Sequence, residues 1–233
     1  MKSRFMSIVI FLFILLLFFY TYNFFYTPQS IATFQSYTSP SHKIDKKLVE
    51  LFNSEDMEVK KEAKKKILET TLTAIQYEKW QELADYIDLR IYVENVLPKG
   101  TEQLILVLNL SKDLAAVAVF EAIADEYVLH SKIENIMPVD KIEFLPIASY
   151  PYKMMFIYQT LDEKFGANFY EEFVDVYFHL SNDFMNIWNK TLYYEEIYKE
   201  VWLDPQADQT LWNRVVEDTT ISFTQDNPMK INT

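Results

Sequence analysis

The residues whose types and spacing best suit chemistry lie between positions 169 and 180. Glu171, Asp175 and His179 recur at intervals of four, so in a β-strand, where alternate residues point to the same side, they would share one face. Two carboxylates and an imidazole can bind a divalent metal ion or transfer protons. The pattern predicts a metal site here if a neighbouring strand adds ligands, because one strand cannot bring all three together. The alternative is that these three residues form the polar face of an edge strand and bind nothing.

A second candidate is the aromatic stretch that follows. Trp188, Tyr194 and Trp202 are predicted to bind a ligand, since sugars stack on aromatic rings that are flanked by carboxylates. The flanking carboxylates are Glu195 and Glu196. Adjacent residues of a strand face opposite ways, so these two are a poor glycosidase pair, which needs both carboxyl groups on one sugar. The alternative is that the aromatic residues form core or cross-strand pairs.

The composition excludes several classes of chemistry. The chain has no cysteine and only two glycines, Gly100 and Gly166. Without cysteine there is no disulfide, thiolate nucleophile or thiolate metal site. The phosphate-binding and nucleophile-elbow motifs that depend on glycine are also absent. We therefore expect no cofactor, and the sequence favours a protein that is not an enzyme.

The charge distribution bears on partners. The net charge is −12, and residues 67–233 hold 28 acidic against 12 basic residues. A surface this acidic repels nucleic acid, so no nucleic-acid partner is expected. Residues 43–66 instead hold eight lysines against six acidic residues. These lysines either contact anionic lipid or wall polymer or form a solvated helix face, and the second interpretation is preferred.

The elements that must position the candidate sites begin with a hydrophobic segment. Residues 5–26 carry no charge, and about 20 apolar residues span a bilayer as a helix. Lys2 and Arg4 precede the segment, whereas no Lys or Arg follows until Lys43. By the positive-inside rule the N-terminus is cytoplasmic and the rest of this single-pass cell-membrane protein is extracytoplasmic. The residues expected to span the membrane include Phe5, Ile10, Leu15 and Tyr20.

Cleavage of this segment is the alternative. Ser30, Ile31 and Ala32 form a possible signal-peptidase site, and cleavage after Ala32 would give a secreted protein. A signal peptide, however, has an apolar core of about 7–15 residues. The longer stretch here favours an uncleaved anchor.

The composition and spacing divide the chain into five parts. Polar residues at both ends of the extracytoplasmic region predict a linker and a tail. The expected parts are the membrane anchor at 1–26, the linker at 27–42, a helical segment at 43–90, an antiparallel β-rich domain at 91–224 and the polar tail at 225–233.

Two amphipathic helices are expected in the helical segment. The first covers residues 44–52. For the second, apolar residues recur at spacings of three and four from Val59 to Ile87. Before them, Ser54 suits an N-cap and Glu55 and Asp56 suit the first helical turn. The helical pattern lapses near Asp88.

The β-rich domain is expected to consist of strands joined by short turns. Residues 169–180 and 187–203 fit a helix or a strand, and their aromatic richness favours strands. Residues 162–168 read as a turn. The clearest strands are 104–110 and 114–123, a hairpin around residues 111–113, and further strands are expected at 127–136, 141–145, 153–160 and 219–223.

The predicted fold is α+β: an N-terminal transmembrane helix, then one or two amphipathic helices packed on a mostly antiparallel, meandering β-sheet of about seven strands. The favoured function is a non-catalytic, membrane-anchored envelope module that binds a partner or ligand. A carboxylate-dependent hydrolase of envelope polysaccharide and a structural component of an envelope assembly stay open. The expected partners are the lipid bilayer and an envelope protein or polysaccharide. The excess of 19 lysines over three arginines is typical of an AT-rich bacterial genome.

Overall fold

The structure, a computed structural model, describes residues 42–147, 150–165, 167–224 and 230–233. All of them belong to one compact unit, Ser39–Thr233. The predicted membrane-spanning segment at residues 5–26 and the predicted linker up to residue 41 lie outside the described residues. Within the described ranges, no helix is long and apolar enough to cross a membrane.

Two α-helices lie near the start of the described chain, as the apolar spacing predicts. α2 spans Lys46–Phe52 and α3 spans Met57–Ala74. Before them, the side chains of Asp45 and Asp56 accept hydrogen bonds from backbone N–H groups of the first turn. Such caps satisfy donors that the helix itself leaves free, which fixes where each helix begins.

The second helix is shorter than predicted, because it ends at Ala74 and not near Ile87. Gln76 has a φ of 67°, in the left-handed region that a right-handed helix does not include. The chain continues as the 3₁₀-helix η1, Glu78–Tyr86, whose Trp80 still packs against the same core. Side chains three residues apart share a face in a 3₁₀-helix too, so the apolar spacing continues past the end of the α-helix.

Sheet 1 has five antiparallel strands. They are Lys43–Asp45 (β1), Asp88–Glu94 (β2), Gln103–Ser111 (β3), Leu114–Ile123 (β4) and Glu126–Ile136 (β5). Their order is β1-β5-β4-β3-β2. The predicted hairpin of β3 and β4 is confirmed. The edge strands β1 and β2 were not expected, since both begin in the segment 43–90 for which the sequence predicts helices.

Sheet 2 also has five antiparallel strands. They are Val139–Pro146 (β6), Lys153–Phe165 (β7), Ala167–Leu180 (β8), Asp183–Lys199 (β9) and Trp212–Asp218 (β10). Their order is β10-β9-β8-β7-β6. A separate hairpin pairs β11, Ser222–Thr224, with β12, Lys230–Asn232. The mostly antiparallel α+β class is thereby confirmed.

The strands differ from the prediction in number and extent. Twelve strands lie in the described residues, arranged in three sheets, and not about seven in one. The region 162–168, predicted as a turn, is mostly strand, because β7 and β8 pair as far as Phe165 and Ala167. The predicted polar tail at 225–233 contains β12. The sequence also gave no indication of β10.

The two aromatic segments of ambiguous pattern are strands, as favoured. Residues 169–180 lie in β8, and most of residues 187–203 lie in β9. β9 ends at Lys199, and a 3₁₀ turn, Glu200–Trp202 (η2), follows it. Pairing on both sides therefore decides the conformation that local propensity leaves open.

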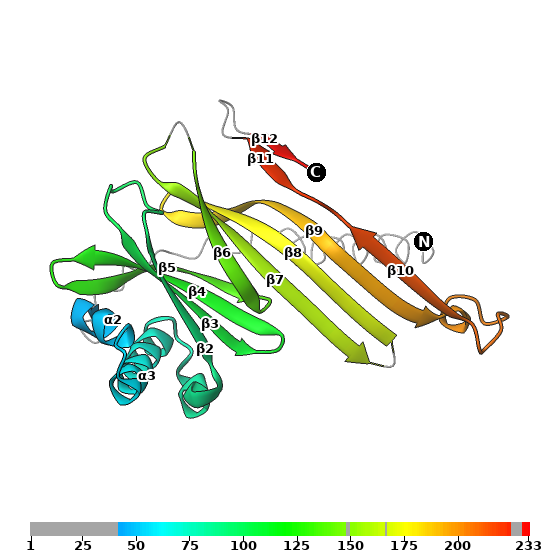
Figure 1. Cartoon of the computed structure of the whole chain (residues 1–233), viewed down its shortest axis with the longest axis horizontal. Helices are drawn as coiled ribbons and strands as arrows, with labels where there is room; N and C mark the ends of the chain where they lie inside the picture. Colours follow the sequence, from blue (N-terminus) through cyan, green and yellow to red (C-terminus); the bar gives the residue numbers. More distant parts are fainter. Residues whose placement is uncertain (1–41, 148–149, 166, 225–229) are drawn as a thin grey trace, which may run out of the picture. The chain divides into compact units, whose positions relative to one another are not determined.

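β3 and β4 are buried on both faces. On one face, Leu104, Leu106 and Phe120 pack with residues of α3. On the other, Ile105 and Val117 pack with residues of sheet 2. Sheet 1 therefore lies between the helices and sheet 2, as Figure 1 shows. Strands covered on both faces have continuous apolar runs and no alternation, which is the pattern of β3 and β4.

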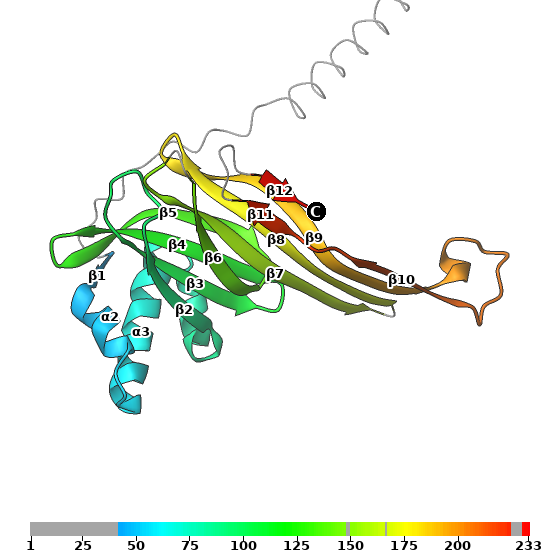
Figure 2. The ribbon, with the colours of Figure 1, turned by 45° about the horizontal axis from the view of Figure 1, so that its top comes forward.

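The other face of sheet 2 holds a third apolar cluster. Phe156 lies in this cluster, and Phe223 of β11 packs on it with ring centroids 4.5 Å apart. Further along, β8, β9 and β10 run past sheet 1 (Figures 1 and 2). We call residues 167–173, residues 190–199 and β10 the projecting end of sheet 2. None of its residues is buried.

Candidate functional site

The predicted metal residues share one strand but not one site. Glu171, Asp175 and His179 all lie on β8. Glu171 and Asp175 line a shallow cavity of about 240 Å³, together with Phe173, Asn189, Lys190 and Thr191. His179 is only 5 % exposed and contacts a residue of sheet 1 instead. In the described part of the chain, no three His, Asp or Glu side chains form a group that could hold a metal ion.

Both carboxylates of the shallow cavity accept hydrogen bonds from neighbouring strands. The Gln159 amide donates to Asp175 Oδ2 at 2.7 Å, and the Thr191 hydroxyl donates to Glu171 Oε1 at 2.6 Å. The cavity is thus a polar recess whose two carboxyl groups already have hydrogen-bond partners within the sheet.

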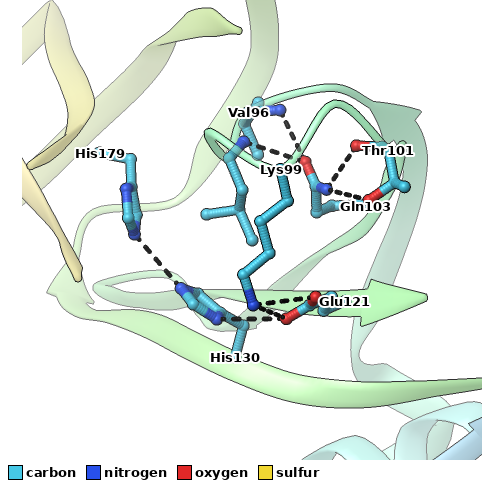
Figure 3. Close-up of polar contacts among 8 residues, drawn as sticks. Val96, Lys99, Thr101, Gln103, Glu121, His130 and His179 are labelled. Carbon is cyan, nitrogen blue, oxygen red and sulfur yellow. Dashed lines mark hydrogen bonds and ion pairs between the residues drawn. The ribbon is translucent and has the colours of Figure 1, made fainter. Parts of the chain in front are cut away.

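His179 forms a pair with His130 (Figure 3). The two Nε2 atoms lie 3.3 Å apart. His130 belongs to β5 of sheet 1 and His179 to β8 of sheet 2, so the pair joins the two sheets. The side chain of His130 is 13 % exposed. The Tyr152 hydroxyl donates to the backbone oxygen of His179 and helps to hold this end of β8.

A β-bulge directs His130 towards His179. Val119 of β4 pairs with Ser131 and Phe120 pairs with Leu129, so His130 is the extra residue between two registers. A bulge of this kind breaks the strict alternation of a strand and re-aims one side chain. The sequence contains no signal for it.

Glu121 and Lys99 complete the cluster on the side of sheet 1 (Figure 3). Lys99 Nζ lies 2.9 and 2.7 Å from the two carboxylate oxygens of Glu121. Glu121 Oε2 is also 3.8 Å from Nδ1 of His130. We call His130, His179, Glu121 and Lys99 the histidine cluster. Sequence reasoning missed three of its members, because their positions along the chain have no common spacing.

Gln103 fixes the loop that carries Lys99. Its side-chain oxygen accepts hydrogen bonds from the backbone N–H groups of Val96 and Leu97, at 2.8 and 3.0 Å. Its amide donates to the backbone oxygen of Thr101. Gln103 is fully buried, so these bonds form without competition from water.

The environment of the cluster favours neutral imidazoles. Burial lowers the pKa of His130, and Lys99 adds to this, while Glu121 and Asp183 act in the opposite direction. Burial also lowers the pKa of His179, as does His130 beside it. With one Nε2 atom facing the other, only one of the two can carry a proton without two donors meeting.

We expect the folded chain to become less stable as the pH falls from 7 to 5. The measurement includes a metal chelator, so that no metal ion occupies the histidines. Unfolded histidines take up protons near their ordinary pKa of 6.5, whereas the folded pair takes them up only at lower pH. Stability is therefore full above about pH 7, falls as the pH drops below about 6.5, and levels off below the folded pKa.

Urea unfolding at several pH values measures this effect. The double variant His130→Gln, His179→Gln should show a flatter profile between pH 5 and 7. A parent chain with equal stability at both ends of this window would contradict the prediction.

The predicted ligand-binding aromatics lie apart from one another. Trp188 packs with the apolar cluster beneath β11. Tyr194 pairs across the strands with Glu171 and shares its face of sheet 2, which is opposite to the face that holds Trp188. Trp202 lies in η2 beyond the end of β9 and contacts Trp212, with ring centroids 5.8 Å apart. The structure thus does not bring Trp188, Tyr194 and Trp202 onto one surface.

The projecting end of sheet 2 combines tyrosine with glutamate. The Tyr193 hydroxyl donates to Glu195, and the Tyr194 hydroxyl donates to Glu196. Glu195 and Glu196 are adjacent in β9 and therefore face opposite sides of the sheet, as expected for a strand. None of the other described elements forms a second layer over this end (Figures 1 and 2), and its residues are half-buried or exposed.

The edge of this region is apolar as well as exposed. β10 is the last strand of sheet 2, and its Val215 and Val216 are 43 % and 45 % exposed. The connection that leads into β10 exposes the large apolar side chains of Trp202, Leu203 and Leu211. Trp212, the first residue of β10, is exposed as well.

Comparison with known protein families, with curated proteins and with solved structures gives no match for this chain.

Proposed function

We propose that this protein is a non-catalytic binding module, anchored in the cell membrane by residues 5–26, which binds a protein partner outside the cytoplasm through the projecting end of sheet 2. The observation that carries this proposal is the exposed terminal strand β10. Its outer edge lies at the end of the strand order, and Val215 and Val216 are both about half exposed. Exposed apolar edge strands are normally protected or paired, which supports a partner at this edge.

The chemistry of the edge favours a partner strand with basic residues. A strand added to β10 would bond with backbone groups on its free edge. Arg214 is paired with Glu195 at 2.6 Å and Lys190 with Glu217 at 3.5 Å, and Lys199 lies over the ring of Trp212. Glu196 and Asp218 add to the acidic groups, so that acidic side chains outnumber basic ones at this edge. An excess of acidic side chains attracts and orients a partner of opposite charge.

The shallow cavity supports binding over hydrolysis. A glycosidase needs one carboxylic acid that protonates the leaving group. The two carboxyl groups of a glycosidase lie about 5–9.5 Å apart, whereas Glu171 and Asp175 are four positions apart on the one strand β8, which is about 13 Å along a strand. The polysaccharide hydrolase therefore has less support than the binding module.

Site-specific photo-crosslinking in the full-length chain tests the binding proposal. A photoreactive residue in place of Trp212 should yield one discrete protein adduct in living cells, and the adduct should be lost in the variant Val215→Lys, Val216→Lys. These changes add positive charge at exposed positions and repel a basic strand. The matched controls are a photoreactive residue in place of Lys61, on α3, and the exposed-site change Met57→Lys. An adduct from Lys61 of the same mass, or one that survives the double change, would refute the proposal.

The topology has a separate test, which the absence of cysteine makes simple. We expect a membrane-impermeant maleimide to label Lys112→Cys in intact cells, because Lys112 lies in an exposed turn of the domain proposed to be extracytoplasmic. Ser3→Cys should react only after lysis, because the N-terminus is proposed to face the cytoplasm. Labelling of Lys112→Cys only after lysis would contradict the orientation. A mature chain that lacks the Ser3→Cys thiol would indicate cleavage.

A further inference from the structure

The geometry of the histidine pair is that of two ligands on one metal ion. Imidazole nitrogens bind zinc at about 2.0–2.1 Å, so two of them on a tetrahedral ion lie about 3.3–3.4 Å apart. The Nε2 atoms of His130 and His179 are 3.3 Å apart, which is long for a hydrogen bond between nitrogens. An ion could enter between them with little movement of either strand.

We propose that His130 and His179 bind one divalent transition-metal ion, zinc in the first place, through their Nε2 atoms, and that this ion joins sheet 1 to sheet 2. Neutral imidazole suits zinc, copper and nickel, whereas magnesium and calcium prefer oxygen ligands. The described residues offer no third protein ligand, so water completes the coordination. The proposal is independent of the binding function proposed for β10.

Glu121 stands where a metal-bound histidine needs a carboxylate. A histidine ligand almost always donates its second ring N–H to a carboxylate or carbonyl, which fixes the ring and its tautomer. Glu121 Oε2 lies 3.8 Å from Nδ1 of His130, and Lys99 holds the carboxylate through both oxygens. This separation is beyond hydrogen-bond length, and a shift of less than about 1 Å would let Nδ1–H donate to the carboxylate. His130 would then keep its proton on Nδ1 and present a free Nε2 lone pair. His179 must do the same when the ion binds.

Three further observations fit a cation at this point. The bulge in β5 turns His130 towards His179, as bulges do beside functional sites. The charged groups around the pair are two carboxylates and one ammonium group, so their net charge is negative. They are Glu121, Asp183 and Lys99. Finally, Phe184 packs edge-on against the His179 ring at 5.3 Å and limits its rotation, which favours a pre-arranged ligand.

Zinc titration of the full-length, detergent-solubilised chain, without a histidine tag, tests the proposal. We expect calorimetry to show one zinc ion per chain. At zinc concentrations about a hundred times the dissociation constant, we expect the Tm to rise by roughly 5–10 °C, because the ion binds only the folded state. Magnesium at the same concentration should leave the Tm unchanged.

Variants separate this site from other zinc binding. His130→Gln and His179→Gln should each abolish the stoichiometric binding, and Glu121→Gln should weaken it about 10–100-fold. His42→Gln removes the remaining histidine of the chain and should bind zinc like the parent. Glu121→Gln keeps both ligands, so it still tests the proposal if a histidine variant fails to fold. The proposal is overturned if the parent binds no zinc, if magnesium acts like zinc, or if His179→Gln still binds.

Discussion

Phe120→Ala is expected to lower the free energy of unfolding by about 3–5 kcal/mol, which for a domain of this size lowers the Tm by roughly 6–20 °C. Phe120 is fully buried in β4 and faces the core between sheet 1 and the helices. Truncation removes most of a large apolar side chain and leaves a cavity, because strands paired on both sides cannot close around it.

Denaturant unfolding followed by tryptophan fluorescence measures this loss, and the matched control lies three residues away on the same strand. Ile123 is 53 % exposed, so Ile123→Ala should change the stability by no more than about 0.5 kcal/mol. A similar loss of stability in both variants would mean that the face of β4 that carries Phe120 does not pack against the helices.

The second large effect is expected at Gln103. In Gln103→Leu, the buried N–H groups of Val96 and Leu97 lose their acceptor, since both bond to the Gln103 side-chain oxygen. A buried polar group without a partner costs about 1–3 kcal/mol, so we expect a loss of about 2–5 kcal/mol. The loop also carries Lys99, which fixes Glu121, so the histidine cluster should lose order as well.

Hydrogen exchange gives this prediction a local measure. The amide protons of Val96 and Leu97 should exchange faster in Gln103→Leu than in the parent, even under conditions where both chains are folded. Glu102→Gln is the matched control, because Glu102 is exposed in the same loop beside Gln103, and it should change the stability by no more than about 0.5 kcal/mol. Unchanged exchange in Gln103→Leu would show that another acceptor serves these N–H groups.

The elements that the sequence predicts well are those whose signals are local. The hairpin of β3 and β4 needs only two apolar runs and a short polar turn, and all of these lie within 21 residues, from Gln103 to Ile123. The polar residues 54–56 predict the start of the second helix, although the N-cap is Asp56 and not Ser54 as expected; Asp56 bonds to residues two or three positions away. Short-range contacts of this kind leave a pattern that can be read along the chain.

The elements that the sequence predicts poorly depend on partners far along the chain. The length of β7 and β8 is set by their mutual pairing, which carries both strands through residues predicted to turn. β10 is mostly exposed, and β9 gives it the strand conformation that its own sequence does not signal. The division into two stacked sheets was also missed, although the unbroken apolar runs of β3 and β4 indicate strands covered on both faces.

The sequence by itself determined the α+β class, the two amphipathic helices, the central hairpin and the shared strand of Glu171, Asp175 and His179, because periodicity within one element is a local property. It did not determine which of these side chains would meet other groups. His130 and His179 lie 49 positions apart, and only the stacking of sheet 1 on sheet 2, with a bulge in β5, brings their rings together. Contacts between layers have no period in the sequence, so the histidine cluster is decided by the tertiary structure.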